Sequence, residues 1–436
     1  MHQFRDPIHG FIEISTSEKK IIDSPPFQRL RNIRQLATTY LVYHGAEHTR
    51  FGHSLGVMHL VTKTFDSVVR KNDLLFRSDK AENDIVTLWY RQILRLIALT
   101  HDLGHAPFSH ASESVFGKGF EHEDFTRKII LETEIANHIS EIGSQFQSEY
   151  GIQYKITPAL ICMIYEGKDV LHPDFIMPDF KFLQSFMDSE LDCDKMDYLL
   201  RDSHFCGVSY GKYDLERFIS TLTVYKKANE KIIHLAIEKG GIQAFEEFVL
   251  ARYFMFIQVY FHKTRRLFDK KLIECLKKIL PNGKYPSDIN DYLSWDDNKV
   301  LNFISAGDQE VYSDYRNRVT MACVYETRVH ANSMADENIF KMLCYSLSKK
   351  FGKENFIFDD FDKKAHKLTP VFWGHADDSG YGISVIDKNS PEPSNIMDES
   401  LILKGILEPI HIKRIYAQKD ICIAAKLFID ELKGDV

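Results

Sequence analysis

The adjacent residues His101 and Asp102 carry an imidazole and a carboxylate, two groups that bind divalent metal ions. Residues 91–100, which precede them, favour helix and are mostly apolar, so they predict a helix that is buried on most of its faces. Gly104 and Pro107 then end this helix. A buried imidazole and carboxylate both need partners, and a divalent cation satisfies both at once. The pair therefore indicates a metal site.

A plainer interpretation is a His-Asp hydrogen bond near a helix terminus, without an ion. For an isolated pair this interpretation would be preferred. Here two further histidines, His105 and His110, follow within one short segment. Clustered histidines and carboxylates are typical of metal or catalytic sites. The sequence therefore favours a metal site.

Two distant residues, His53 and Asp194, complete a candidate ligand set. His53 opens a helix whose apolar residues repeat at i, i+4 over residues 57–69 and predict a core stripe. Asp194 lies in a helix expected over residues 187–205, and polar residues four and eight positions further on share its face. A helix with such an inward face must border a ligand cavity or solvent.

The four candidate ligands are two imidazoles and two carboxylates with no thiolate. This set suits one divalent ion of iron, manganese, zinc, nickel or magnesium, with positions left for water and phosphate oxygen. Such an ion would screen the charge of a phosphate ester and make hydroxide available near neutral pH. The residues thus indicate metal-assisted hydrolysis of a phosphate ester.

A second constellation joins His110 to Glu113, three residues further on. A carboxylate at this spacing can orient the imidazole and prepare it to protonate a leaving oxygen. His105 and His122 could donate hydrogen bonds to phosphate, or could support the metal ligands from behind. Both roles stay open for these two histidines.

Helices are expected to position these groups. One, over residues 27–36, is started by Pro26 and carries three arginines, which form either a solvated basic face or a phosphate contact. A longer one, over residues 240–266, carries Arg252 and Tyr260 on one face. The sequence therefore predicts a mainly α protein.

The character of the chain changes beyond about residue 276. Helices continue to about residue 351, and strand-like segments follow at 356–358, 369–373, 381–387 and 406–417. They predict a small antiparallel sheet. We therefore expect a helical catalytic core over residues 1–275, with its metal-site segment at about 48–205, and an α+β lobe over residues 276–436 with a regulatory or oligomerisation role.

Composition excludes several classes of protein. The chain has 436 residues, 44% of them hydrophobic and 27% charged, as in ordinary globular proteins. No apolar run approaches membrane-spanning length and the first residues show no signal-peptide pattern, so we expect a cytoplasmic protein without a membrane partner. Seven scattered cysteines without a CxxC pair argue against a zinc-thiolate site. A net charge of −7 argues against nucleic acid as the partner.

The spacing of His53, His101-Asp102 and Asp194 resembles that of the HD-domain metal-dependent phosphohydrolases. The flanking segments 6–10, 27–31, 48–56, 101–110 and 194–202 look like those of deoxynucleoside triphosphate (dNTP) triphosphohydrolases. The resemblance runs from about residue 4 to 268. It implies an HD-domain helical core and hydrolysis of a dNTP to a deoxynucleoside and intact triphosphate.

The resemblance also implies roles for individual residues. His110, supported by Glu113, would act at the leaving 5′ oxygen. The substrate would be held at the triphosphate by Arg50, Lys195 and Arg252, at the sugar 3′-hydroxyl by Gln35, next to Leu36, and Asp202, and at the sugar ring by Tyr198 and Tyr260.

A regulatory site is implied as well. The family's activating pocket binds a guanine nucleotide, GTP or dGTP, between subunits, and would map to Asp23, Gln28, Arg31 and Arg217. This implies a homo-oligomer, either a dimer or a tetramer. Two alternatives stay open from the residues: an HD phosphohydrolase or phosphodiesterase acting on another nucleotide, and a nucleotide-sensing module with little turnover.

Overall fold

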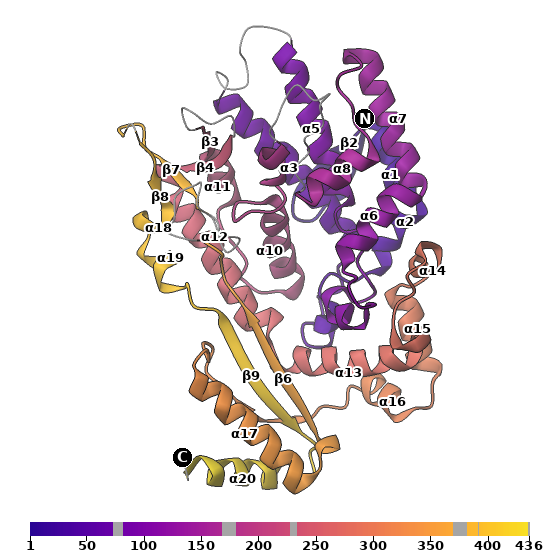
Figure 1. Cartoon of the computed structure of the whole chain (residues 1–436), viewed down its shortest axis with the longest axis vertical. Helices are drawn as coiled ribbons and strands as arrows, with labels where there is room; N and C mark the ends of the chain where they lie inside the picture. The colour runs from indigo at the N-terminus through magenta and orange to yellow at the C-terminus, as the bar shows by residue number, and fades with distance from the viewer. Residues whose placement is uncertain (73–81, 168–179, 227–232, 369–381, 391, 435–436) are drawn as a thin grey trace.

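Two long helices, α3 (Arg50–Lys71) and α5 (Glu82–Thr100), pack against each other in the upper part of the view in Figure 1. Helix α10 (Cys193–Cys206) packs against α3. The structure is a computed structural model, and it describes residues 1–72, 82–167, 180–226, 233–368, 382–390 and 392–434.

The described residues are mainly helical, which confirms the predicted fold class. The other helices are α1 (Thr16–Asp23), α2 (Pro25–Gln28), α6 (His122–Glu132), α7 (Glu134–Tyr150), α8 (Pro158–Tyr165), α9 (Phe180–Gln184), α11 (Leu215–Thr221), α12 (Ile242–Met255), α13 (Lys263–Ile279), α14 (Ile289–Leu293), α15 (Asp297–Ala306), α16 (Glu310–Arg316), α17 (Met334–Phe351), α18 (Ile396–Glu399), α19 (Leu401–Gly405) and α20 (Cys422–Gly434). Short 3-10 helices include Arg29–Asn32, Ala37–Leu41 and Ser109–Val115, and Phe256–Tyr260 is a π-helix.

Three small sheets accompany the helices. An N-terminal hairpin pairs β1 (His2–Asp6) with β2 (Gly10–Ile14). A four-stranded sheet has the order β3 (Leu222–Tyr225), β4 (His234–Glu238), β7 (Ser384–Ile386), β8 (Ser394–Asn395). A three-stranded sheet has the order β5 (Ala322–Glu326), β9 (Ile410–Ala417), β6 (Phe356–Lys363). The single antiparallel sheet expected near the C-terminus is therefore wrong in part. β6 and β9 do pair antiparallel, but β7 joins the other sheet and lies parallel to β4. The strand expected at 369–373 lies outside the described residues.

The core helices follow the apolar pattern of the sequence. The stripe at i, i+4 spacing on α3, from Val57 to Val69, is buried as predicted. Gly56 on the same helix faces α10, and a β-carbon there would overlap the carboxylate of Asp197. A glycine at this position thus lets α10 approach α3 closely enough to place its polar face beside α3.

Three expected helices have different limits. The helix expected over 27–36 stops at residue 32, after a turn of 3-10 helix, because Ile33 is extended. The helix expected over 187–205 starts only at Cys193, since the side chain of Asp192 caps it. The helix expected over 240–266 is broken into α12, the π-helix and α13.

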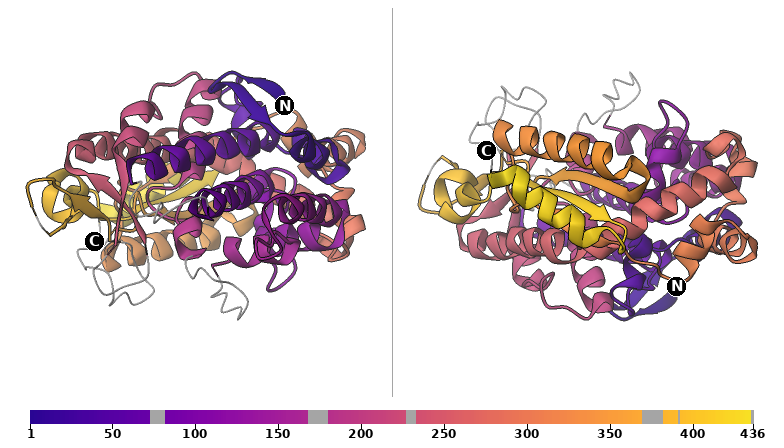
Figure 2. Two further views of the ribbon diagram at one scale, coloured as in Figure 1. Left: turned by 90° about the horizontal axis from the view of Figure 1, so that it is seen from above. Right: turned by 90° about the horizontal axis from the view of Figure 1, so that it is seen from below.

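The C-terminal lobe has a small core of its own. Apolar side chains of α17 and α20 pack on the β5–β9–β6 sheet, and Figure 2 (right) shows both helices lying across it. The main core continues past residue 275, through Tyr292 and Val300 to Ile412. The boundary at residue 275 between a catalytic core and a C-terminal lobe stays a prediction.

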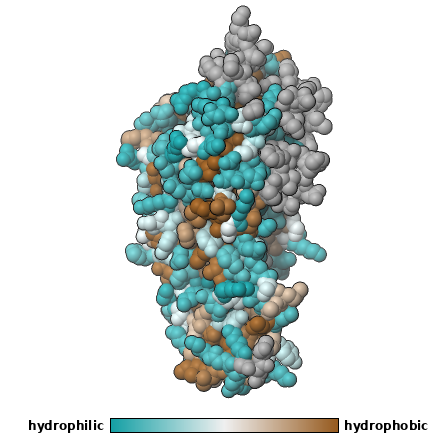
Figure 3. Space-filling model, turned by 90° about the vertical axis from the view of Figure 1, so that its left-hand side faces the viewer, coloured by the Kyte–Doolittle hydropathy of each residue, from teal (hydrophilic) through white to brown (hydrophobic). Residues whose placement is uncertain are grey.

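The surface seen in Figure 3 is largely hydrophilic, with apolar side chains gathered near its middle and its foot. On α20, Ile423 and Leu427 are exposed large apolar residues. Among the described helices, none is both long enough and apolar enough to cross a lipid bilayer.

Candidate metal centre

The structure brings the four predicted metal ligands together. His53 comes from the first turn of α3, His101 and Asp102 follow the end of α5, and Asp194 lies in the first turn of α10. The Nε2 atom of His53 lies 2.9 Å from Asp194 Oδ1 and 3.6 Å from Asp102 Oδ2. The Nε2 atom of His101 lies 3.3 Å from Asp102 Oδ1 and 3.7 Å from Asp194 Oδ1.

Each of the two imidazoles directs Nε2 into the cluster because its Nδ1 is bonded elsewhere. His101 Nδ1 donates to the Ala98 carbonyl at 2.7 Å, and His53 Nδ1 donates to Asp197 Oδ2 at 2.8 Å. A second partner that fixes the ring in this way is the usual support of a metal-ligating histidine. The arrangement thus fits a divalent cation.

One nitrogen atom of the cluster lacks a hydrogen-bond partner in the described part of the chain. His101 Nε2 is buried and makes no hydrogen bond among the described residues. A buried nitrogen lone pair without a partner is costly, and a cation held by His53, His101, Asp102 and Asp194 would satisfy it. His53, His101 and Asp102 also meet within the ligand separation expected around one ion.

Charge in the cluster is balanced by neighbouring side chains. Burial lowers the pKa of His53, but its hydrogen bonds to Asp194 and Asp197 outweigh burial and raise that pKa to about 10. Burial raises the pKa of Asp102, but the charges of Arg50 and His101 hold it well below its usual range. Asp102 is therefore ionised, as a metal ligand must be, and His53, which is protonated in the metal-free cluster, would release its Nε2 proton when a cation binds.

Asp197 is a functional residue that the sequence reading missed. It receives two hydrogen bonds from the Arg201 guanidinium, at 2.8 and 3.0 Å, and one from His9 Nε2 at 2.6 Å. Arg201 in turn donates to Asp6 at 2.9 Å. The N-terminal hairpin and α10 thus fix the carboxylate that orients His53. The spacing of Asp197 from Arg201, i and i+4 on one helix, was the available signal.

Arg50 also lies at the metal centre. Its Nη1 donates to Asp102 Oδ2 at 2.5 Å, and its Nε donates to the hydroxyl of Ser109 at 2.8 Å. Arg50 therefore links the adjacent residues His101 and Asp102, the HD pair, to the segment that carries His110.

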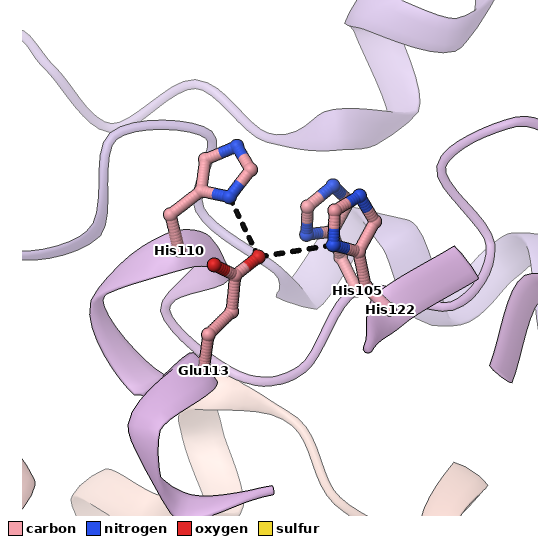
Figure 4. A group of neighbouring side chains, drawn as sticks. All are labelled: His105, His110, Glu113 and His122. Carbon is pink, nitrogen blue, oxygen red and sulfur yellow. Dashed lines mark hydrogen bonds and ion pairs between the residues drawn. The ribbon is translucent and has the colours of Figure 1, made fainter. Parts of the chain in front are cut away.

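The second predicted constellation also forms (Figure 4). His110 Nδ1 lies 2.7 Å and His122 Nδ1 lies 3.0 Å from Glu113 Oε1. The ring of His105 stacks on that of His122 with centroids 4.0 Å apart. Burial raises the pKa of Glu113, but both histidine hydrogen bonds outweigh it and hold that pKa far below its usual range. His105 Nε2 lies 3.2 Å from Asp102, so the two clusters adjoin.

Asp297 is a second missed residue, and it lies in the region assigned to the C-terminal lobe. Its carboxylate accepts the backbone N–H of Phe108 at 2.7 Å and that of Arg34 at 3.0 Å. Phe108 and Ser109 both have left-handed backbones, with φ of 60° and 52°, a conformation that is costly for residues other than glycine. Asp297 thus holds the strained turn just before His110. No local sequence signal marks a contact between residues so far apart.

The three predicted triphosphate ligands lie on three helices: Arg50 on α3, Lys195 on α10 and Arg252 on α12. Lys195 on α10 pairs with Asp192, and Arg252 on α12 donates to Glu190 at 3.1 Å. The Nε atom of Arg252 is buried and has no hydrogen-bond partner among the described residues. Partial desolvation, followed by the charges of Arg252, Lys367 and Lys195, lowers the pKa of Lys363, which is otherwise exposed at the end of β6. The lobe therefore adds a cation near this group, which the sequence reading missed.

The predicted sugar contacts are only partly together. Tyr260 donates to Asp202 Oδ2 at 2.7 Å, and His48 Nε2 lies 2.8 Å from the other oxygen of that carboxylate. The Tyr198 and Tyr260 rings meet edge to face, 6.4 Å apart. Gln35 is buried with its Oε1 unpaired among the described residues, and neighbouring Leu36 belongs to the core.

The predicted regulatory residues fall into two places. Arg31 donates to Gln28 Oε1 at 2.8 Å and stacks on the Phe51 ring, while Asp23, the last residue of α1, pairs with Lys19. Arg217 lies on α11, where it donates to the Gly240 carbonyl at 2.6 Å. Helices α11 and α2 stand on different sides of the view in Figure 1. One chain does not bring the four residues into one pocket.

Two protein-family models match the chain. The HD domain model matches residues 50–150, which include three of the four candidate metal ligands, and the HD associated region model matches residues 213–345. Among solved structures, a hypothetical protein from Aquifex aeolicus is 32% identical, with a TM-score of 0.75 and coverage of 98% of both chains.

Curated proteins are similar over a shorter span. The chain is 34% identical over 332 residues to the uncharacterized protein YwfO of Bacillus subtilis, covering 70% of this chain and 66% of that protein. It is 30% identical over 296 residues to the deoxynucleoside triphosphate triphosphohydrolase SAMHD1 of Gallus gallus, covering 64% of this chain and 45% of that protein. The chain thus spans about half to two thirds of these relatives.

We expect Asp197→Asn to weaken metal binding by about 10- to 100-fold, because the carboxylate that orients His53 loses its charge. Isothermal titration of the metal-free protein with Mn²⁺ measures this. The matched control is Asp66→Asn, since Asp66 lies on the same helix as His53 but pairs with Arg91 at the surface. Wild-type affinity in a folded Asp197→Asn protein would contradict the role assigned to Asp197.

Proposed function

The chain belongs to the HD-domain family, and from that premise we propose that it is a metal-dependent phosphohydrolase that converts a dNTP to a deoxynucleoside and inorganic triphosphate. The supporting observation is the cluster of His53, His101, Asp102 and Asp194, whose polar atoms meet as metal ligands do. The relative named as a dNTP triphosphohydrolase supports the choice of substrate.

A divalent cation held by these four side chains would supply a Lewis acid for phosphate oxygens and hydroxide near neutral pH. Its identity among iron, manganese, zinc, nickel and magnesium is left open by a donor set of nitrogen and oxygen. The side chain of Asp194 is about one-third exposed, at 33%, which leaves one side of the cluster open to a ligand.

Arg50, Lys195 and Arg252 are proposed to bind the triphosphate. A triphosphate carries several negative charges, so it would compete with the carboxylates of Asp192 and Glu190 for these cations. The unpaired Nε of Arg252 is a donor that such a substrate would satisfy.

His110 is proposed to donate a proton to the leaving 5′ oxygen. Its Nδ1 is bonded to Glu113, so the Nε2 atom of this exposed side chain is the one that can meet a substrate. Protonating an alkoxide as it leaves contributes about 10²- to 10⁴-fold to the rate. His122 either donates a hydrogen bond to phosphate or supports the metal ligands, whereas His105, whose Nε2 lies 3.2 Å from Asp102, is proposed to support the metal ligands.

We propose that Asp202 and Gln35 bind the sugar 3′-hydroxyl and that Tyr198 and Tyr260 pack against the sugar. The hydrogen bond from Tyr260 fixes Asp202 in place. A rigid, crowded wall at the sugar is what rejection of a 2′-hydroxyl requires.

Activation by a guanine nucleotide and assembly into a dimer or tetramer are also part of the proposal. Asp23, Gln28 and Arg31 lie apart from Arg217 in one chain, so a pocket that uses all four would be completed by a second copy. The exposed apolar residues of α20 offer a surface for contact between copies.

We expect the purified protein with Mn²⁺ to release deoxynucleoside and intact triphosphate from a dNTP, as resolved by anion-exchange chromatography. Asp102→Ala should abolish this release because it removes a metal ligand and the partner of Arg50. Release of monophosphate and pyrophosphate would contradict the proposed reaction. A preference for a signalling nucleotide over every dNTP would favour a different HD phosphohydrolase.

We expect Asp297→Asn to lower kcat by about 10- to 100-fold, because an amide cannot accept both backbone N–H groups and the turn before His110 shifts. KM and metal content should stay close to wild type, since Asp297 contacts neither a metal ligand nor a proposed substrate ligand. Asp296→Asn, which retains a capping side chain at the neighbouring position, is the control. An unchanged kcat in Asp297→Asn would contradict the positioning role.

A further inference from the structure

The side chains of His105, His110, Glu113 and His122 form a cluster distinct from the four ligands of the HD pair. Figure 4 shows the three rings and the carboxylate converging from the 3-10 helix, the preceding turn and the start of α6. We propose that this cluster binds a second divalent cation.

The first argument is a nitrogen that lacks a partner. His105 Nε2 faces Asp102 Oδ1 at 3.2 Å, so it is the nitrogen that carries the proton and donates. His105 Nδ1, on the other side of the ring, is then an acceptor, and it is buried without a hydrogen bond among the described residues. The same feature marks His101 Nε2 in the first cluster. A phosphate cannot satisfy such a nitrogen, because both would be acceptors; a cation can.

The second argument concerns His122. Its Nε2 lies 3.3 Å from Glu123 Oε1, and its Nδ1 lies 3.0 Å from Glu113 Oε1. In the metal-free cluster His122 Nδ1 bonds to Glu113; an ion on Nδ1 would replace that hydrogen bond, and Nε2–H would then donate to Glu123. Metal-ligating histidines commonly donate their other N–H to a carboxylate in this way. His105 and His122 both have that outer partner.

The separations of Glu113 from His110 and His122 fit one ion, and the ligand atoms of all four residues lie within 4.8 Å of one another. Ligands that bind at about 2.1 Å and lie at right angles around a metal are about 3 Å apart. Glu113 Oε1 lies 2.7 Å from His110 Nδ1 and 3.0 Å from His122 Nδ1. Three imidazoles with one carboxylate favour zinc, manganese, iron or nickel over magnesium, which prefers oxygen. The side chain of His110 is 62% exposed, so the ion has a route from solvent.

Binding of this ion would be compatible with the proposed role of His110, and this point alone rests on the proposed function. An ion on Nδ1 would replace the hydrogen bond to Glu113 and leave Nε2–H as the donor to a leaving oxygen. The ring of His105 stands between the two clusters, with one nitrogen toward each. The second cation therefore belongs near the leaving group, beside the first ion and separate from it.

Metal counting tests the inference without any assay of turnover. After dialysis against Mn²⁺ and removal of free metal, inductively coupled plasma mass spectrometry should measure two manganese ions per wild-type chain. Glu113→Gln and His110→Asn should each retain one ion, and His53→Asn should also retain one. Anomalous scattering at the manganese edge should then place the ion of His53→Asn among His105, Glu113 and His122.

Glu132→Gln, an exposed change on the same helix as His122, is the matched control and should keep both ions. One ion in the wild-type chain, with the same count in Glu113→Gln and in His110→Asn, would overturn the second site. The product analysis is independent of this result, because triphosphate release by a one-ion protein would leave the proposed reaction intact and refute only the second cation.

Discussion

The structure depends on bringing acidic and imidazole side chains together at the buried crossing of α3, α5 and α10. Two carboxylates and two imidazoles would be costly there without compensation. The chain meets part of that need with Arg50 on Asp102 and with Arg201 on the Asp197 that holds His53. Nitrogen and oxygen atoms still face one another at the centre, and a divalent cation is the species that satisfies them together.

This constraint connects distant parts of the chain to one site. The N-terminal hairpin reaches it through Asp6 and His9, which fix Arg201 and Asp197. The region beyond residue 275 reaches it through Asp297, which holds the turn before His110. The HD pair is thus supported from both ends of the sequence, and the C-terminal region contributes to the site itself as well as to its own small core.

Features with a regular period, or carried by a short motif, were predictable from the sequence. The apolar stripe of α3 and the buried end of α5 are found as expected, because side-chain period is a local property. The four candidate ligands lie together in the structure, and their role as metal ligands stays a prediction. The first and last residues of the helices were less predictable from the sequence. The start of α10 depends on the cap by Asp192, and the break after Met255 is a π-helix that the apolar pattern does not reveal.

Contacts between distant residues were not predictable. Neither the hydrogen bonds to Asp297 nor the cation at Lys363 leaves a trace in local spacing, and the pairing of β7 with β4 is fixed by tertiary packing.

The central claim is that four side chains share one cation. A crystal structure of the protein grown with Mn²⁺ tests it most directly through the anomalous map. The account predicts a peak about 2.0–2.2 Å from ligand atoms of His53, His101, Asp102 and Asp194. The absence of a peak there, with His53 Nε2 still bonded to Asp194, would contradict it.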